Sequence, residues 1–312
     1  MPETAIPTYV GLDISKARLD HTLDENRIAS VPNDANGHRK LVGWLKTQSH
    51  VRVVCEPSGG YERTVVATML TAGIEVCLAH AGRARHYALA EGLLAKTDAI
   101  DAQMLRRYGQ AVKLRLAEPP DPPTAQLREL VDRRRGLLDR LTEVTGQLEL
   151  AGKTLAHWLK REDRFLSREL EAIEQEISSH IDQHPTLKQK FLRMQELTGV
   201  GPVLASTLLA YVPELGAVPD ATVSSILGVA PYAHDSGESH NARHIRGGRG
   251  QARRVLYMAA ICAIRHNPVL KAFYERLRAN GKPPKVCVVA VMRKMATVIN
   301  RLLADPNFKL AN

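Results

Sequence analysis

Tyr9-Val-Gly-Leu-Asp-Ile-Ser15 is a short apolar stretch that predicts a buried strand. Asp13 interrupts this stretch where the segment itself gives no reason for an acid. Two further strand patterns, Ala17–Leu23 and Arg27–Val31, follow after short polar turns. We therefore expect the chain to open with strands that are linked by hairpins.

An amphipathic helix and a second apolar strand continue this pattern. The helix is expected over Ala35–Thr47 and the strand over Val51–Cys55, which Glu56 ends. A crossover helix lets the later strand run parallel to the first, so the two strands are expected to be neighbours. This is the opening of a ribonuclease-H-like sheet, and it would bring Asp13 and Glu56 to one edge.

Two more acids open a later helix, in Lys96-Thr-Asp-Ala-Ile-Asp-Ala102. Thr97 is the expected N-cap, and the i, i+3 spacing of Asp98 and Asp101 places both on one helix face. The helix dipole alone explains an acid in the first turn, such as Asp98. It does not explain the other three acids together.

Four carboxylates are of the residue type that binds metal ions and are expected to lie close together, namely those of Asp13, Glu56, Asp98 and Asp101. Carboxylates that are brought together repel one another unless a cation joins them. Oxygen-only ligands suit Mg²⁺ or Mn²⁺, and two such ions can activate the attacking oxygen and stabilise the leaving oxygen of a phosphodiester. The four acids therefore predict a metal-dependent nuclease site.

Composition limits the class of protein. The 312 residues suffice for two or three domains, and 44% are hydrophobic but only 4% aromatic, which favours an α/β or mostly helical fold. No apolar run approaches the roughly 20 residues of a transmembrane helix, and the N-terminus lacks a signal-peptide pattern. We expect a cytoplasmic protein without membrane contact.

The four cysteines are Cys55, Cys77, Cys262 and Cys287. Each lies in an apolar stretch, and none forms a Cys-x-x-Cys pair. We therefore expect buried thiols rather than zinc ligands or disulfides.

The net charge of +10 is concentrated in one segment of the chain. Residues 235–301 contain 14 Lys and Arg against 3 Asp and Glu, whereas the rest of the chain is nearly balanced. Within this segment, His244-Ile-Arg-Gly-Gly-Arg-Gly-Gln-Ala-Arg-Arg254 mixes arginines with glycines that let backbone approach a phosphate. The pattern favours a polyanion as partner over a basic surface that only keeps the protein soluble.

The proline-rich stretch Glu118–Thr124 marks a domain boundary because it cannot continue a helix. Beyond it, Leu and Ile recur at three- and four-residue steps from Leu127 to Ile181, with a charged break at Lys160–Arg164. This predicts two long helices over residues 124–184, forming an antiparallel hairpin or a dimeric coiled coil. A three-helix packing within one chain is the alternative, because the apolar seam has gaps.

A third region runs from residue 185 to residue 312. Its first motif, Leu197-Thr-Gly-Val-Gly-Pro-Val-Leu204, resembles a helix-hairpin-helix, whose turn N–H groups at Gly199 and Gly201 can hold a nucleic-acid phosphate. An ordinary tight connection between helices explains the motif equally well. Amphipathic helices with basic outer faces are expected over Gln251–His266, Pro268–Asn280 and Pro284–Ala304.

Ser236, in Ala230-Pro-Tyr-Ala-His-Asp-Ser-Gly237, is a second chemical candidate. A serine in an Asp-Ser-Gly turn is more often a turn residue whose hydroxyl caps the backbone. Ser236 lies, however, near the start of the basic segment of residues 235–301. A nucleic-acid strand bound by this segment would therefore lie beside Ser236. A serine nucleophile would form a phosphoserine link to DNA and conserve bond energy for rejoining, with Arg243 and Arg246 to neutralise the phosphate.

The ordered set of motifs resembles a known family. Along the chain occur Gly-Leu-Asp-Ile-Ser-Lys, Cys-Glu-Pro-Ser-Gly, Lys-Thr-Asp-x-x-Asp-Ala and Leu-Thr-Gly-Val-Gly-Pro, then Gly-Val-Ala-Pro, Asp-Ser-Gly, Gly-Gly-Arg and Leu-Tyr-Met-Ala-Ala. Together they are similar to the DEDD transposases of the insertion-sequence "one-ten" class, relatives of the Piv DNA invertase. Each motif is weak alone, and the set spans nearly the whole chain.

The resemblance implies a three-domain organisation. Residues 1–118 would form a RuvC-like catalytic domain whose Asp13, Glu56, Asp98 and Asp101 bind two ions of Mg²⁺ or Mn²⁺. Residues 124–184 would form a coiled coil that assembles a dimer or tetramer. Residues 185–312 would form a helical transposase domain with the nucleophile Ser236.

The resemblance also implies nucleic-acid partners. In this family a structured non-coding guide RNA pairs with donor and target DNA and supplies specificity. The protein would bind this RNA and double-stranded donor and target DNA, reading shape and backbone. The expected contact residues are Gly199, Gly201, Arg243, Arg246, Arg249, Arg253 and Arg254.

Two other functions need fewer of these features. A RuvC-like structure-specific endonuclease of the Holliday-junction resolvase type acts by hydrolysis, and needs the four acids and the basic face but not Ser236. A non-catalytic nucleic-acid scaffold needs only the basic segment. The acids and the serine together favour a DNA recombinase, and the family resemblance implies that a guide RNA directs it.

Overall fold

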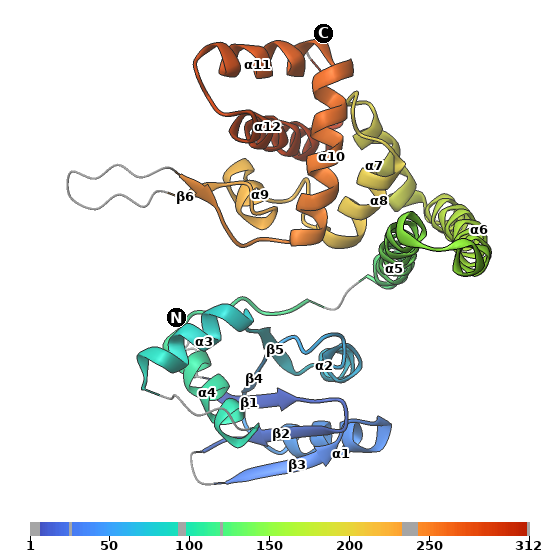
Figure 1. The fold of residues 1–312 in the computed structure, drawn as a ribbon. Helices are drawn as coiled ribbons and strands as arrows, with labels where there is room; N and C mark the ends of the chain where they lie inside the picture. The colour runs from blue at the N-terminus through green and yellow to red at the C-terminus, as the bar shows by residue number, and fades with distance from the viewer. Residues whose placement is uncertain (1–6, 25–26, 93–97, 119–120, 233–242, 311–312) are drawn as a thin grey trace. The chain divides into compact units, whose positions relative to one another are not determined.

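The computed structural model describes residues 7–24, 27–92, 98–118, 121–232 and 243–310, without the side chains of residues 98–100 (Figure 1). The chain divides into two compact units, residues 1–120 and residues 121–312. The first unit is a sheet covered by helices, and the second is mostly helical. This succession of an α/β part and a helical part agrees with the fold class that the sequence predicts.

The first unit is built on a five-stranded sheet with the order β3-β2-β1-β4-β5. Antiparallel pairs join β1 to β2 and β2 to β3, whereas β4 is the parallel neighbour of both β1 and β5. The predicted hairpins and the predicted crossover to a parallel strand are confirmed. The strands are β1 Thr8–Ile14, β2 Arg18–Thr22, β3 Ile28–Pro32, β4 Val51–Cys55 and β5 Glu75–Leu78.

Helices cover both faces of this sheet (Figure 1). One face packs against α1 and α2 in a core that includes Leu12, Leu41 and Val65. The other face packs against α3 and α4 in a core that includes Val54 and Leu105. Both cores draw on the same strands because successive residues of a strand point to opposite faces. The helices are α1 Ala35–Lys46, α2 Glu62–Thr71, α3 Ala81–Ala90 and α4 Asp98–Ala111.

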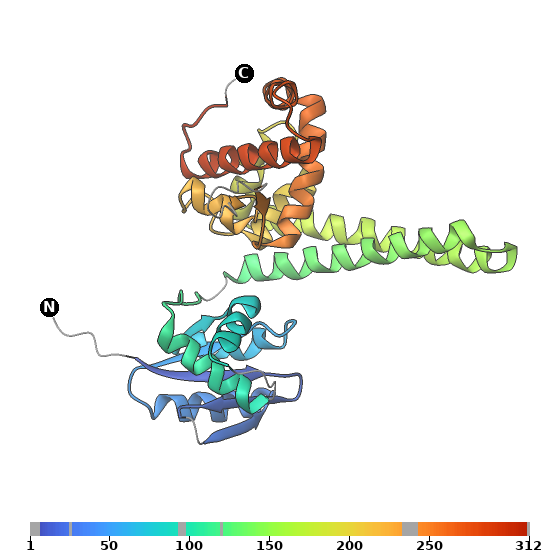
Figure 2. The ribbon, with the colours of Figure 1, turned by 60° about the vertical axis from the view of Figure 1, so that its left-hand side comes forward.

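A long helical hairpin opens the second unit (Figure 2). It consists of α5 Pro122–Leu150 and α6 Lys153–Gln183, whose seam includes the buried Leu137, Val144 and Leu159. An antiparallel hairpin is one of the three arrangements that the leucine spacing leaves open, and it is the one observed within this chain.

The turn of the hairpin does not lie where the charge pattern placed it. The two long helices are separated only by Ala151 and Gly152, and the predicted break at Lys160–Arg164 is wrong. These charged residues continue α6 between Leu159 and Leu166, which stay buried against α5. A run of charges can occupy the outer side of a helix without ending it.

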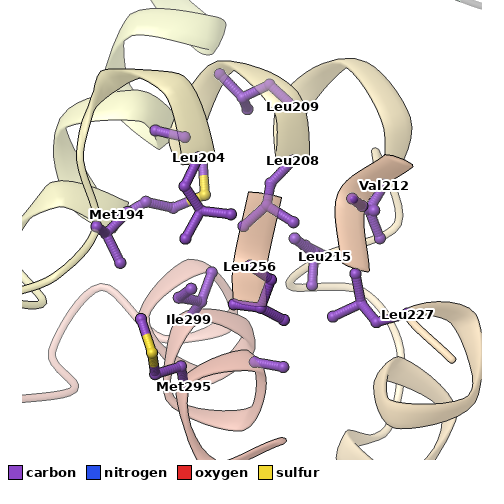
Figure 3. Close-up of a cluster of buried hydrophobic side chains, with 14 of the residues drawn as sticks. Met194, Leu204, Leu208, Leu209, Val212, Leu215, Leu227, Leu256, Met295 and Ile299 are labelled. Atoms are coloured by element: carbon purple, nitrogen blue, oxygen red, sulfur yellow. The ribbon is translucent and has the colours of Figure 1, made fainter. Parts of the chain in front are cut away.

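Helix α8, whose residues are almost all buried, packs on α5, α7 and α10. Its side chains contribute to the apolar core of the second unit (Figure 3). Leu204 and Leu208 of α8 share a core with Leu256 of α10 and Ile299 of α12. The three C-terminal helices predicted from the sequence are confirmed to within one residue at each end. The elements are α7 Pro185–Gln195, α8 Pro202–Tyr211, α9 Asp220–Ile226, β6 Pro231–Tyr232, β7 His244–Ile245, α10 Gly250–His266, α11 Pro268–Ala279 and α12 Pro284–Ala304.

A polar contact holds the base of the hairpin to this bundle. The hydroxyl of Tyr211, at the end of α8, donates a hydrogen bond to Asp132 of α5. The guanidinium carbon of Arg128 lies 4.8 Å from the centroid of the Tyr211 ring. Burial raises the pKa of Tyr211, and so does the hydrogen bond to Asp132, so the phenol stays a donor at neutral pH.

The cysteines agree with the prediction at three of four positions. Cys55, Cys77 and Cys287 are buried, whereas Cys262 is exposed. The prediction is wrong for Cys262 because only one stripe of α10 faces the core, formed by Ala252, Leu256, Ala260 and Ala263. Among the described helices, none is both long and apolar enough to cross a membrane.

A candidate carboxylate site at one edge of the sheet

Asp13 and Glu56 lie side by side where the pairing between the parallel strands β1 and β4 ends. The last paired positions of β1 and β4 are Leu12 and Cys55, and Asp13 and Glu56 are the next residues along each strand. Residues at equivalent positions of neighbouring parallel strands share a face of the sheet. Both acids are half-buried. The predicted meeting of Asp13 and Glu56 at one sheet edge agrees with this register.

Helix α4 runs antiparallel to β1 and directs its N-terminus to the same edge. A Cβ built on Gly11 would lie 1.8 Å from the carbonyl oxygen of Ala102, so only glycine allows the helix this close. At the other end of the contact, a Cβ built on Gly109 would lie 2.7 Å from the ring of Tyr9. The first turn of α4 therefore lies toward the end of β1 that carries Asp13.

The remaining two acids belong to this first turn of α4. Asp98 is the first helical residue, and its side chain lies outside the described part of the structure. Asp101 is half-buried and precedes Ala102, which contacts Gly11. The backbone thus brings Asp101 toward the strand end of Asp13, and the positive end of the helix dipole favours negative charge there.

The donor chemistry of these residues fits a hard divalent cation. Carboxylate oxygens are the ligands that Mg²⁺ and Mn²⁺ prefer, and no sulfur or imidazole belongs to the predicted set. Among the side chains that the structure describes, no three of His, Cys, Asp and Glu lie close enough together to hold a metal ion. The side chain of Asp98 lies outside this described set.

A further acid, Asp20, lies on this face and was missed by the sequence reasoning. It is the direct cross-strand partner of Asp13 in the β1–β2 register and is only 6% exposed. Its Oδ1 lies 3.4 Å from Nη2 of Arg18, and Nε of Arg18 donates to Oγ of Ser30 at 3.0 Å. Leu19, Asp20, His21 and Thr22 are all buried, so the pattern of this strand does not by itself show which face of the sheet Asp20 occupies.

The loop that follows Glu56 is held by hydrogen bonds to the carboxylate of Glu62. Oε2 of Glu62 accepts hydrogen bonds from the backbone N–H of Ser58 at 3.0 Å and of Gly60 at 2.8 Å. Burial raises the pKa of the neighbouring Cys55 thiol, and the charge of Glu62 raises it further. Cys55 is therefore protonated at neutral pH and serves as a core residue rather than as a nucleophile.

The candidate nucleophile of the second unit, Ser236, lies outside the described residues. The chain that leads into and out of its segment is described: Pro231 pairs with Ile245, and Tyr232 pairs with His244, in the two-stranded sheet of β6 and β7. These pairs bring together the two points at which the segment begins and ends.

The arginines that follow β7 differ in what they contact. Arg249 donates two hydrogen bonds to Glu214, at 2.5 and 2.6 Å, and Nη1 of Arg253 donates to the carbonyl oxygens of Gly228 and Gly247. The sequence predicts that both contact nucleic acid and does not reveal these partners within the protein. Arg243, Arg246 and Arg254 are exposed. A role of any of the five in nucleic-acid binding stays a prediction.

Packing against α10 requires the first glycine of the Gly-x-Gly turn, Gly199. Gly199 has a φ of +106°, and a Cβ at this position would lie 2.5 Å from Cβ of Ala263 in α10. Gly201 is exposed, and a Cβ there would meet nothing within 4 Å. The contact explains Gly199 without a ligand, so phosphate binding by this turn stays a prediction.

The two units together define a class of protein. An α/β unit in which Asp13 and Glu56 follow the last paired positions of two parallel strands, followed by a helical unit that carries the basic segment, is the organisation expected of an enzyme that cuts and joins DNA. Comparison with known proteins gives the particular family.

Two family models match the chain in order. A model described as "Transposase" matches residues 10–151, and a model described as "Transposase IS116/IS110/IS902 family" matches residues 192–275. Together they cover more than two thirds of the 312 residues.

Curated relatives extend the likeness over nearly the whole chain. The pilin gene-inverting proteins of Moraxella lacunata and Moraxella bovis are each 25% identical over 304 residues, which is 93% of this chain and 94% of theirs. An uncharacterized 43.6 kDa protein of insertion element IS110 from Streptomyces coelicolor is 29% identical over 219 residues, 66% of this chain and 52% of its own.

The chain belongs to the IS110 family of transposases. It is a DNA transposase or recombinase, and DNA is its substrate. The family resemblance that the ordered motifs indicate is thereby confirmed.

Proposed function

We propose that this protein is an RNA-guided recombinase of an insertion sequence, which cuts and rejoins DNA strands through a DEDD carboxylate site and a serine nucleophile. The observation that carries the proposal is the β1–β4 register, in which Asp13 and Glu56 follow the last paired positions at the edge that the first turn of α4 approaches. The ordered family motifs support the other parts of the proposal, namely the serine nucleophile and the guidance by RNA.

The fold of the first unit is proposed to be ribonuclease-H-like, of the RuvC type. Three antiparallel strands, a crossover helix and a fourth strand parallel to the first support this assignment. In such a sheet an acid in the first strand and an acid after the fourth face one substrate. Asp13 lies in the first strand of this chain and Glu56 follows the fourth, which supports the assignment.

The chemistry follows from the residue types. Two ions of Mg²⁺ or Mn²⁺ bound by Asp13, Glu56, Asp98 and Asp101 would supply Lewis-acid activation at the scissile phosphate. The Ser236 hydroxyl oxygen forms a bond to phosphorus, its proton passes to solvent or a nearby base, and one sugar oxygen of the DNA leaves. A sugar hydroxyl of a second DNA end then replaces the serine, so rejoining needs no external energy source.

The specificity of this reaction is proposed to come from a guide RNA. The exposed arginines Arg243, Arg246 and Arg254 suit phosphate contacts, which position nucleic acid without reading its sequence. Base pairing between RNA and DNA would then select donor and target. The protein is proposed to act as a dimer or tetramer, with the α5–α6 hairpin as the assembling element.

Two experiments test the proposal. With magnesium, guide RNA and DNA, wild-type protein should give a covalent protein–DNA adduct through residue 236, and Ser236→Ala should give none. Cleavage that persists in Ser236→Ala without an adduct would instead identify a hydrolase.

The second experiment asks whether protomers share the active site. Asp13→Ala and Ser236→Ala proteins are each inactive in this proposal. When they are mixed in one assembly, activity should return if the acids and the serine of one site come from different protomers. Absence of recovery would contradict a shared site while leaving the serine chemistry intact.

A further inference from the structure

Asn33 joins the two chain segments that leave the sheet after Asp13 and Glu56. Its Nδ2 donates a hydrogen bond to the carbonyl oxygen of Ser15 at 2.8 Å and another to that of Tyr61 at 3.3 Å. Ser15 lies two residues after Asp13, and Tyr61 lies five residues after Glu56. A single amide group therefore bridges the β1–β2 turn and the loop that leads from β4 to α2.

A buried histidine orients this amide. Nε2 of His38 lies 2.7 Å from Oδ1 of Asn33, and His38 is only 4% exposed. Burial lowers the pKa of His38, against the opposing effect of Asp34, so the ring is neutral at pH 7. A neutral ring protonated at Nε2 donates to Oδ1 and leaves both Nδ2 hydrogens for the two carbonyl oxygens.

The backbone around Asn33 is held at both ends. The N–H of Asn33 donates to the carbonyl oxygen of Ala17 at 2.9 Å. Asp34 caps α1 by accepting from the N–H of Asn36 and Gly37. The bridge is thus attached to a helix start on one side and to the β1–β2 turn on the other, which limits how far the amide can move.

The loop on the other side of the bridge is also closed. Glu62, the first residue of α2, accepts hydrogen bonds from the N–H groups of Ser58 and Gly60, so its carboxylate fixes the loop between Glu56 and α2. Asn33 then attaches the end of this loop, at Tyr61, to the β1–β2 turn. Neither contact involves a residue of the predicted metal quartet.

We propose that Asn33 is a positioning residue that sets the separation between the carboxylates of Asp13 and Glu56. This inference rests on the metal-binding role proposed for these acids, and it adds a residue that no sequence motif indicated. The sheet register places the two strand ends side by side, but the chain leaving each strand determines where each carboxylate reaches. Mg²⁺ requires near-ideal octahedral geometry, so a small change in this separation weakens binding.

The test measures metal affinity directly and does not depend on DNA cleavage. The substitution Asn33→Leu keeps the approximate size and removes both Nδ2 donors. Asn36→Leu is the matched control, because it makes the same change three residues away at an exposed position of α1. Full-length wild-type protein and both variants are titrated with Mn²⁺ and followed by electron paramagnetic resonance, and their thermal unfolding is recorded.

Asn33→Leu should weaken Mn²⁺ binding by about tenfold, the scale of changes outside the metal ligands themselves, and Asn36→Leu should bind as wild type. Equal Mn²⁺ affinity in Asn33→Leu and wild type would overturn the inference and leave the metal site standing. A wild-type chain that binds no Mn²⁺ would overturn the proposed metal site, and the inference with it.

Variants of His38 separate positioning from a general loss of stability. His38→Gln can keep an N–H donor directed at Oδ1 of Asn33, whereas His38→Leu cannot. Mn²⁺ affinity should therefore be weaker in His38→Leu and close to wild type in His38→Gln. Equal weakening in both variants would contradict a role for the His38 hydrogen bond in orienting Asn33.

Discussion

Replacing Gly11 by alanine tests the close packing of α4 on β1. A Cβ at this position would lie 1.8 Å from the carbonyl oxygen of Ala102 and 2.7 Å from the amide nitrogen of Arg106. Ordinary contacts of a Cβ begin at 3.4 Å, so α4 would have to move away from the strand by on the order of 1.5 Å. Overpacking a core costs about 1–3 kcal/mol of folding stability. We expect Gly11→Ala to lie near the upper limit, because the new Cβ would clash with helix backbone atoms, which cannot rotate away as a side chain can.

Thermal unfolding measures this cost. A loss of about 3 kcal/mol corresponds to a fall of roughly 10 °C in Tm for a unit of this size. Gly43→Ala is the control, because Gly43 is an exposed position of α1 where a Cβ meets nothing within 4 Å. This second variant should be neutral or more stable by up to about 1 kcal/mol, since alanine is the better helix former.

The same substitution should affect catalysis more than stability alone explains. Movement of α4 carries Asp101 away from the strand end that bears Asp13, and a misplacement of about 1 Å can lower a rate by about 100-fold. Strand-transfer rates are compared at a temperature where both proteins are folded. A Gly11→Ala protein that unfolds at the wild-type temperature and recombines DNA at the wild-type rate would refute the packing argument.

Three further predictions concern separate parts of the chain. Asp101→Asn should abolish strand transfer while lowering Tm by no more than a few degrees, and retention of activity would exclude the acid from the site. Arg249→Gln should destabilise the second unit by about 2 kcal/mol in urea unfolding, because it breaks the double hydrogen bond to Glu214; a variant as stable as wild type would show that this pair contributes nothing. Burial lowers the pKa of both His21 and His38 below the ordinary value of 6.5, so the folded state favours their neutral forms. Their contribution to the stability of the first unit is complete above pH 6.5 and is lost as the pH falls below it, which unfolding by urea across this range measures, and a flat profile would contradict it.

The sheet order could be predicted because it depends on local pattern and chain connectivity. Strands that are joined by short turns pair as hairpins, and a helix between two strands makes them parallel neighbours. These rules place Asp13 beside Glu56 without any knowledge of tertiary contacts. The register then confirms that both acids follow the same pair, Leu12 and Cys55.

The hairpin turn could not be found from charge alone. A charged run such as Lys160–Arg164 is compatible with a helix end or with the outer face of a continuing helix. The leucine spacing on either side does not separate the two cases, and only the packing of Leu159 and Leu166 on α5 does. The wrong prediction for Cys262 also arises because packing decides which side of a helix is buried. An apolar helical segment can include residues outside the stripe that faces the core, and Cys262 is one of them.

The contacts made by Asn33 and Arg249 were invisible in the sequence because their partners lie far away along the chain. Asn33 bonds to residues 18 and 28 positions away, and Arg249 bonds to Glu214 across 35 positions. Asp20 needed knowledge of which strand face α4 covers. Acids at strand ends were visible because an ionisable group within an apolar run is unusual, whereas a loop asparagine or a surface arginine is not.

Anomalous diffraction from crystals grown with Mn²⁺ tests the central claim most directly, since it locates the ion and its ligands without assuming any activity. We predict anomalous peaks at the edge where β1 and β4 end, within coordination distance of carboxylate oxygens of Asp13, Glu56, Asp98 and Asp101. Peaks only elsewhere on the protein, or acids at this edge that bind no Mn²⁺, would contradict it.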